Sequence, residues 1–271
     1  GTMTKRPEKP SNEELHDRIL GHFAVLCVPV KGEDIDAAVT QAERHRLSHL
    51  EFLESLIGAQ ANRRRERAIE RRIHEARFSA VRLLETFDWE FNRRAIDRTQ
   101  MEALATCDFV RRRENIVVIG QSGVGKSHLM QAIGRRGCVL GYRVRYITSA
   151  ALLQDLIAGL ADKTLPQRLR RYDRYELLII DEFGLDKIER QESPVASSLM
   201  YKVIDARRCK LSTIVITNID FDAWGSYLGD PPLAMAVLDR VVDNATVIKI
   251  NGRSYPSAKA KRASAPPAAE K

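Results

Sequence analysis

Cysteines are few in this sequence, and long apolar runs are absent. The four cysteines among 271 residues are scattered and form no Cys-x-x-Cys pair. This pattern argues against a zinc module or a disulfide framework and favours reduced thiols. No stretch approaches the ~18 apolar residues of a membrane span, because Pro29 interrupts the longest candidate, residues 23–30. We therefore expect a cytoplasmic protein without a membrane segment.

The composition is otherwise that of a folded protein with a basic surplus. Hydrophobic residues make up 44% and charged residues 30% of the chain, which rules out disorder throughout. The length suits about two domains of ~100–200 residues each. Lys and Arg total 44 against 36 Asp and Glu, for a net charge of +8. This surplus indicates an anionic partner, with nucleic acid first and a membrane surface second.

Basic residues gather in one segment with helical periodicity. Residues 60–77 hold seven arginines against three glutamates, and Ile69, Ile73 and Ala76 recur at helical spacing. The arginines on the opposite face are Arg63, Arg64, Arg67 and Arg71. Such a face can lie along a phosphate backbone, or it can be a solvated surface partly paired with the glutamates. We favour contact with nucleic acid.

The first part of the chain predicts an all-α unit. Residues 11–58 show helical patterns broken at residues 29–32, with one helical stretch expected through residues 35–56. Together with the arginine-rich segment, they predict about three helices and a helical domain for DNA or partner binding over residues 1–85. The tail, residues 256–271, lacks apolar periodicity, and we expect it to be disordered and basic.

Residues 86–255 predict an α/β domain. Strand-like apolar runs alternate there with helical stretches, at residues 116–119, 144–147, 177–180, 213–216 and 247–250. This alternation is typical of βαβ units, so we expect a central parallel sheet with helices on both faces.

A phosphate-binding motif stands between the first strand and the next helix. Residues 120–127 read Gly-Gln-Ser-Gly-Val-Gly-Lys-Ser, the G-x-x-x-x-G-K-S pattern. The glycines let backbone N–H groups point inward at a helix N-terminus, where an anion is held. Lys126 is expected to reach the β- and γ-phosphates, and the Ser127 hydroxyl to ligate Mg²⁺. The predicted nucleotide-binding residues are Gly120, Gln121, Ser122, Gly123, Val124, Gly125, Lys126, Ser127 and His128.

Polar residues follow two further strands. Asp181 and Glu182 come directly after residues 177–180, at the strand end where a second Mg²⁺ contact belongs. Asp181 is the expected metal-linked carboxylate, and Glu182 can orient or deprotonate an attacking water. Asn218 follows the strand at 213–216 and can hold that water or sense the γ-phosphate. Arg240 lies beside an apolar helix face and gains a role only if a neighbouring subunit brings its nucleotide within reach.

Taken in order, these motifs resemble the AAA+ ATPases of the DnaA/DnaC initiator and helicase-loader clade, and within it the IstB-type transposition helper ATPases of bacterial insertion sequences. The resemblance covers roughly residues 15–255. The segments that carry it are Arg77-Phe78, Phe87-Asp88-Trp89, Gly120 to Leu129, Gly141 to Tyr146, Leu178 to Gly184, Thr213 to Trp224, Leu228 to Pro231, Leu238 to Arg240 and Ile250 to Tyr255.

The resemblance implies a helper that binds ATP, assembles into multimers on double-stranded DNA, deforms it, and recruits or stimulates a transposase. It makes residues 120–127 a Walker A motif, Asp181-Glu182 Walker B, Asn218 sensor 1 and Arg240 a trans-acting arginine finger. It implies the sheet order 5-1-4-3-2. The short sequence after the last strand implies that the helical lid is reduced or absent. Channel-facing contacts to DNA would include Lys163, Arg168 and Arg170, although these can equally be solvated.

Two other functions stay open. A helicase loader of the DnaC type would share the ATPase core and differ in its partner. A P-loop kinase for a small metabolite would be a monomer that ignores DNA, and Glu182 argues against it, because a kinase needs no water activator.

Overall fold

The computed structural model describes residues 10–184 and 193–255. The expected tail, residues 256–271, lies outside the described residues. The chain forms two compact units that divide between Glu70 and Arg71.

The first unit contains helices α1 (Asn12–Val25), α2 (Gly32–His45) and most of α3 (His49–Ala76), so the expected set of three helices is confirmed. The single helical stretch expected through residues 35–56 is wrong. Arg46 ends α2 in the left-handed region, with φ of 50°. Ser48 and Glu51 then start α3 with reciprocal side-chain-to-backbone hydrogen bonds of 3.3 and 2.7 Å, which satisfy N–H groups that a helix start otherwise leaves unpaired.

Much of the apolar surface of the first unit is exposed. Its buried hydrophobic residues in the described part of the chain are Ile35 and Leu56. Leu50, Leu53 and Ile57, which follow one another at helical spacing on α3, are 79%, 48% and 55% exposed. A three-helix unit of this size has too little interior to cover such a stripe.

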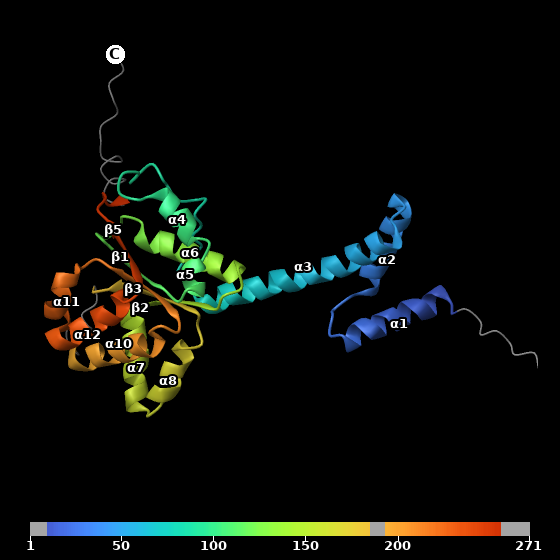
Figure 1. Ribbon diagram of the computed structural model, residues 1–271. Coiled ribbons are helices and arrows are strands. Elements are labelled where there is room, and N and C mark those ends of the chain that lie inside the picture. Colours follow the sequence, from blue (N-terminus) through green and yellow to red (C-terminus); the bar gives the residue numbers. More distant parts are fainter. Residues whose placement is uncertain (1–9, 185–192, 256–271) are drawn as a thin grey trace, which may run out of the picture. The chain divides into compact units, whose positions relative to one another are not determined.

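The second unit is an α/β domain, as the sequence predicts (Figure 1). Its strands are β1 (Asn115–Gly120), β2 (Val144–Thr148), β3 (Leu177–Phe183), β4 (Ser212–Thr217) and β5 (Ala245–Ile250). Its helices are α4 (Arg98–Leu104), α5 (Asp108–Arg111), α6 (Lys126–Val139), α7 (Ser149–Ala161), α8 (Leu165–Tyr172), α10 (Ser193–Arg207), α11 (Phe221–Leu228) and α12 (Pro231–Val242).

The five strands are parallel and lie in the order β2-β3-β4-β1-β5. This is the order that the resemblance to AAA+ ATPases implies, and it puts β4 between β1 and β3. Parallel strands present their carboxyl ends at one edge of a sheet, where open α/β folds bind their ligands. The segments after β1, β3 and β4 therefore meet there.

Alternate residues of each strand enter two different cores. Val117 and Ile119 pack among side chains of α7, α8, α10, α11 and α12. Ile116 and Val118 pack among side chains of α4, α5 and α6. Helices thus cover both faces of the sheet, as Figure 1 shows, which explains why β1 is buried along its whole length.

The segment that follows α3 belongs to the second unit and packs beside α6. The Gln131 side chain on α6 accepts hydrogen bonds from the Ser79 backbone N–H and hydroxyl, at 3.0 and 3.1 Å. Phe78 packs against the core that contains α6.

In residues 10–184 and 193–255, no helix is both long enough and apolar enough to cross a membrane.

Candidate functional site

Glycines shape the turn between β1 and α6. Gly123 and Gly125 have φ of 80° and 105°, which side chains rarely adopt. A Cβ at Gly120 would lie 2.5 Å from the Ile250 carbonyl oxygen, so only glycine fits where the chain leaves the sheet. The first turn of α6 has backbone N–H groups without helical partners, and these can bind an anion.

Lys126, the first residue of α6, lies inside this turn. Its side chain is buried, and Nζ donates hydrogen bonds to the carbonyl oxygens of Gly120 and Gln121 at 2.6 and 2.7 Å. Burial lowers the pKa of Lys126, while the Asp181 carboxylate acts in the opposite direction. The ammonium group is therefore hydrogen-bonded to the same loop whose backbone N–H groups can bind phosphate.

Asp181, on β3, is 2% exposed, and both of its carboxylate oxygens are hydrogen-bonded. Oδ1 accepts from the Glu182 backbone N–H at 2.7 Å, and Oδ2 accepts from the Tyr146 hydroxyl at 2.7 Å. Burial, followed by the hydrogen bond to Asp181, raises the pKa of Tyr146. The phenol is therefore protonated at neutral pH and acts as the donor.

A β-bulge separates Asp181 from the end of β3. Ile180 pairs with Val215 on β4, whereas Phe183 pairs with Thr217, so β3 holds one extra residue between these pairs. Glu182 lies in the bulge with φ of 57°, a conformation uncommon outside glycine. In a regular strand two successive side chains point to opposite faces. Here both Asp181 and Glu182 line one cavity.

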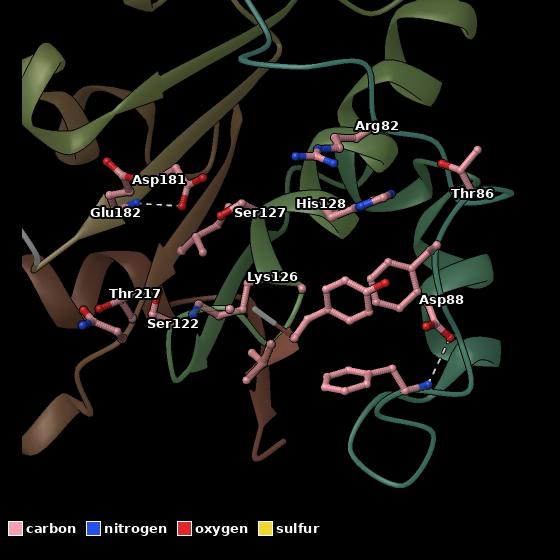
Figure 2. A pocket seen from close by; sticks show the side chains of 18 residues that line it. Arg82, Thr86, Asp88, Ser122, Lys126, Ser127, His128, Asp181, Glu182 and Thr217 are labelled. Carbon is pink, nitrogen blue, oxygen red and sulfur yellow. Dashed lines mark hydrogen bonds between the residues drawn. The ribbon is translucent and has the colours of Figure 1, made fainter. Parts of the chain in front are cut away.

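This cavity has a volume of about 460 Å³ and collects most of the residues expected at the nucleotide (Figure 2). The expected residues that line it are Ser122, Gly123, Val124, Gly125, Lys126, Ser127, His128, Asp181, Glu182 and Asn218. Gly120 and Gln121 contribute the carbonyl groups that hold Lys126. The segments that follow β1, β3 and β4 thus meet at one site, because β4 lies between the other two strands.

The segment before α4 supplies further lining residues that sequence reasoning mostly missed. They are Arg82, Thr86, Phe87, Asp88 and Phe91, and Tyr255 joins them from beyond β5. Phe87, Asp88 and Tyr255 lie in segments that carry the family resemblance, whereas Arg82, Thr86 and Phe91 have no such signal. A Cβ at Gly125 would lie 2.8 Å from the Phe87 ring, so this aromatic packs closely on the loop.

The chain beyond β5 is tied to the phosphate-binding loop. The Tyr255 backbone N–H donates to the Gly123 carbonyl oxygen at 2.9 Å. The Arg253 guanidinium lies 5.7 Å from the centre of the Phe91 ring and is not among the cavity's lining side chains. Of the expected reduced lid, the structure describes the chain only as far as Tyr255.

The donor set of the cavity suits Mg²⁺. Within the described ranges, no group of three or more His, Cys, Asp or Glu residues could hold a metal. Mg²⁺ in nucleotide sites uses one or two protein oxygens, completed by phosphates and water. The Ser127 hydroxyl and the buried Asp181 carboxylate both line the cavity and provide such oxygens.

Arg240, on α12, lies outside the cavity of its own chain. Its Nε donates to Asp205 Oδ1 at 2.5 Å, and its guanidinium lies 4.5 Å from the centre of the Tyr201 ring. Both partners are on α10. These contacts hold the arginine away from the nucleotide site of the same subunit.

The arginines expected to contact DNA differ in their surroundings. Arg63, Arg64, Arg67 and Arg71 are all exposed on α3. Arg63 pairs with Asp34 at 3.1 Å. Arg168 is bound within the chain, to Asp155 at 2.6 Å and Asp162 at 2.7 Å, whereas Lys163 and Arg170 are exposed.

The fold and the cavity define an α/β nucleotide-binding protein with a phosphate-binding loop. The sequence matches the family described as IstB-like ATP binding protein over residues 24–264, and the chain belongs to this family.

Two relatives come from insertion sequences. The chain is 34% identical to the "Insertion sequence IS21 putative ATP-binding protein" of Pseudomonas aeruginosa, over 82% of each chain. It is 35% identical to the "Insertion sequence IS232 putative ATP-binding protein" of Bacillus thuringiensis subsp. berliner, over 83% of this chain and 86% of the relative. Among solved structures, the DnaC helicase loader is 20% identical with a TM-score of 0.49, over 62% of this chain and 96% of that one.

Proposed function

We propose that this protein is an ATP-hydrolysing helper of transposition that assembles on double-stranded DNA, deforms it, and recruits or stimulates a partner transposase. The observation that carries the ATPase part is the β-bulge at Glu182, which brings a metal-binding carboxylate and a second, exposed carboxylate into the cavity of the phosphate-binding loop. The names of the relatives, ATP-binding proteins of insertion sequences, support the role in transposition.

Each charged group of the cavity has a distinct task in hydrolysis. Lys126 and the N–H groups of the loop bind the β- and γ-phosphates. Ser127 and Asp181 hold Mg²⁺, which neutralises charge on the phosphates when bound. Glu182 orients the attacking water and accepts its proton, and Asn218 holds that water by a hydrogen bond. A kinase would use a substrate hydroxyl instead, so the exposed Glu182 favours hydrolysis.

The arginine face of α3 is the proposed duplex contact. Arg64, Arg67 and Arg71 are exposed, with no ion pair to other described residues. Each can neutralise one phosphate and release its counterions, so binding weakens as salt rises. Arg63 is less available, because Asp34 already neutralises part of its charge. ATP favours the DNA-bound assembly only if that assembly binds nucleotide more tightly than the free subunit does.

Fluorescence anisotropy with a labelled duplex tests this proposal. We expect the affinity for the duplex to increase when ATP is present. We also expect the slope of log affinity against log salt concentration to become less steep by about three in R64A/R67A/R71A. The control R93A/R98A/R111A removes three exposed arginines that each pair with a nearby carboxylate, and it is expected to leave the slope unchanged. The absence of duplex binding at low salt, with and without ATP, overturns the proposal.

The partner is tested separately. The tagged protein, ATP and duplex DNA are mixed with purified transposase of the same insertion sequence or with a replicative helicase. Capture of the transposase supports the helper. Capture of the helicase alone supports a loader of the DnaC type instead.

A further inference from the structure

A buried tyrosine lies behind the carboxylate that faces the phosphate-binding loop. We propose that Tyr146 is a positioning residue, whose hydroxyl fixes the orientation of Asp181 and thereby sets the affinity of the nucleotide site for Mg²⁺. This inference rests on the proposed function of the site and adds a residue that neither the P-loop nor the strand-end motifs contain.

The register of the sheet explains how Tyr146 reaches Asp181. On the neighbouring strands β2 and β3, Tyr146 is opposite Ile179, and Thr148 is opposite Asp181. Tyr146 is therefore the diagonal neighbour of Asp181, two positions away on the same face, a separation that a long aromatic side chain spans. The resulting O–H···O distance is 2.7 Å, the usual length of a hydrogen bond from a hydroxyl group.

The two hydrogen bonds of Asp181 come from different directions and together fix its plane. The backbone N–H of Glu182 binds Oδ1, and the Tyr146 hydroxyl binds Oδ2. Each carboxylate oxygen can accept more than one bond, so the carboxylate keeps acceptor capacity toward the cavity. A neutral phenol also leaves the negative charge in place, whereas a lysine or arginine partner would offset the charge that attracts Mg²⁺.

Tyr146 acts only through Asp181. Among the described residues that line the cavity, Asp181 is present and Tyr146 is not. The tyrosine is 7% exposed and packs in the core that contains α6. The competing explanation is that this hydroxyl only satisfies a buried acceptor and stabilises the fold. A positioning role affects the Mg²⁺ dependence of nucleotide binding, whereas a structural role affects the melting temperature.

The test is Y146F, which removes the hydroxyl and keeps the ring. Affinity for a non-hydrolysable ATP analogue is measured by titration calorimetry in EDTA and over a series of Mg²⁺ concentrations. We expect unchanged affinity in EDTA and a rise of about tenfold or more in the Mg²⁺ concentration for half-saturation, as for other partners of metal ligands. A purely structural hydroxyl would lower the melting temperature and leave this Mg²⁺ dependence at the wild-type value.

Tyr172 provides a matched control. Its hydroxyl donates to Asp155 Oδ2 at 2.8 Å, and its side chain is 3% exposed, but neither residue lines the nucleotide cavity. Y172F is expected to keep the wild-type Mg²⁺ dependence. Equal Mg²⁺ dependence in Y146F and wild type overturns the positioning role of Tyr146 and leaves the proposed function standing. Absence of Mg²⁺-dependent nucleotide binding in the wild type overturns the proposed function as well.

Discussion

Asn92 and the backbone of Arg253 form a reciprocal pair of hydrogen bonds. The Asn92 Nδ2 donates to the Arg253 carbonyl oxygen at 3.0 Å, and the Arg253 N–H donates to Asn92 Oδ1 at 3.0 Å. The same Nδ2 also donates to the Val124 carbonyl oxygen at 3.4 Å. One buried amide thus joins the segment before α4, the phosphate-binding loop and the chain after β5.

Asn92→Ala is expected to weaken ATP binding and to lower the free energy of unfolding by about 1–3 kcal/mol, because it removes a hydrogen bond to the buried Val124 carbonyl and two to the partly buried backbone of Arg253. Titration of ATP and chemical denaturation measure the two effects. Asn62→Ala is the control, since Asn62 is exposed and, among the described residues, its side chain is hydrogen-bonded only to Arg65 of the same helix. Equal ATP affinity in Asn92→Ala and wild type would show that the amide does not support the loop.

Arg82 is expected to contact the phosphates of the bound nucleotide. It lines the cavity with Ser127 and His128, is exposed, and forms no ion pair with other described residues (Figure 2). Arg82→Ala should weaken ATP binding by about tenfold or more, since hydrogen bonds to charged groups contribute roughly 1.5–3 kcal/mol. The loss of affinity in Arg82→Ala should be smaller for ADP and absent for adenosine. The control Arg111→Ala should leave the affinities for ATP, ADP and adenosine unchanged. A uniform loss for all three ligands contradicts a phosphate contact.

Glu182→Gln is expected to bind ATP within a few-fold of wild type and to reduce steady-state turnover by roughly 10²–10⁴, the usual contribution of a general base. Phosphate release and nucleotide titration measure turnover and binding. Glu102→Gln, which alters an exposed ion pair with Arg98, should leave both unchanged. Normal turnover in Glu182→Gln would remove this residue from the role of water activator.

The sequence predicts the sheet and the strand-end residues well, for a physical reason. A parallel sheet covered on both faces needs nearly continuous apolar strands, and the runs at 116–119 and 177–180 are of this kind. Polar residues directly after such runs must lie at the ligand-binding edge. The positions of Lys126 and Asp181 therefore follow from local sequence.

Features that depend on turn geometry or distant contacts are not predictable in this way. The break between α2 and α3 has a signal in Ser48 and Glu51, three residues apart, yet the apolar pattern runs through it. No sequence pattern marks the extra residue at Glu182. Arg82 and Tyr255 enter the cavity because segments far apart in the chain pack together, which periodicity does not encode.

Arg240 is proposed to act on the nucleotide of a neighbouring subunit. Because Asp205 and Tyr201 hold it outside its own cavity, Arg240→Ala should retain ATP binding and lose turnover by about 10³-fold or more. Arg208→Ala, which removes an exposed pair with Asp243, should keep turnover.

Mixing two inactive variants distinguishes action in trans from a structural role. An Arg240→Ala subunit keeps Glu182, and a Glu182→Gln subunit keeps Arg240, so a site shared between them contains both groups. In a head-to-tail assembly each subunit contributes one part of its surface to the preceding neighbour and another to the next. Phosphate release from the mixture, with duplex DNA present, should therefore exceed the sum of the separate variants. An arginine that acts within its own subunit, or that only braces α10 against α12, gives no such recovery, because no mixed assembly then contains a complete site.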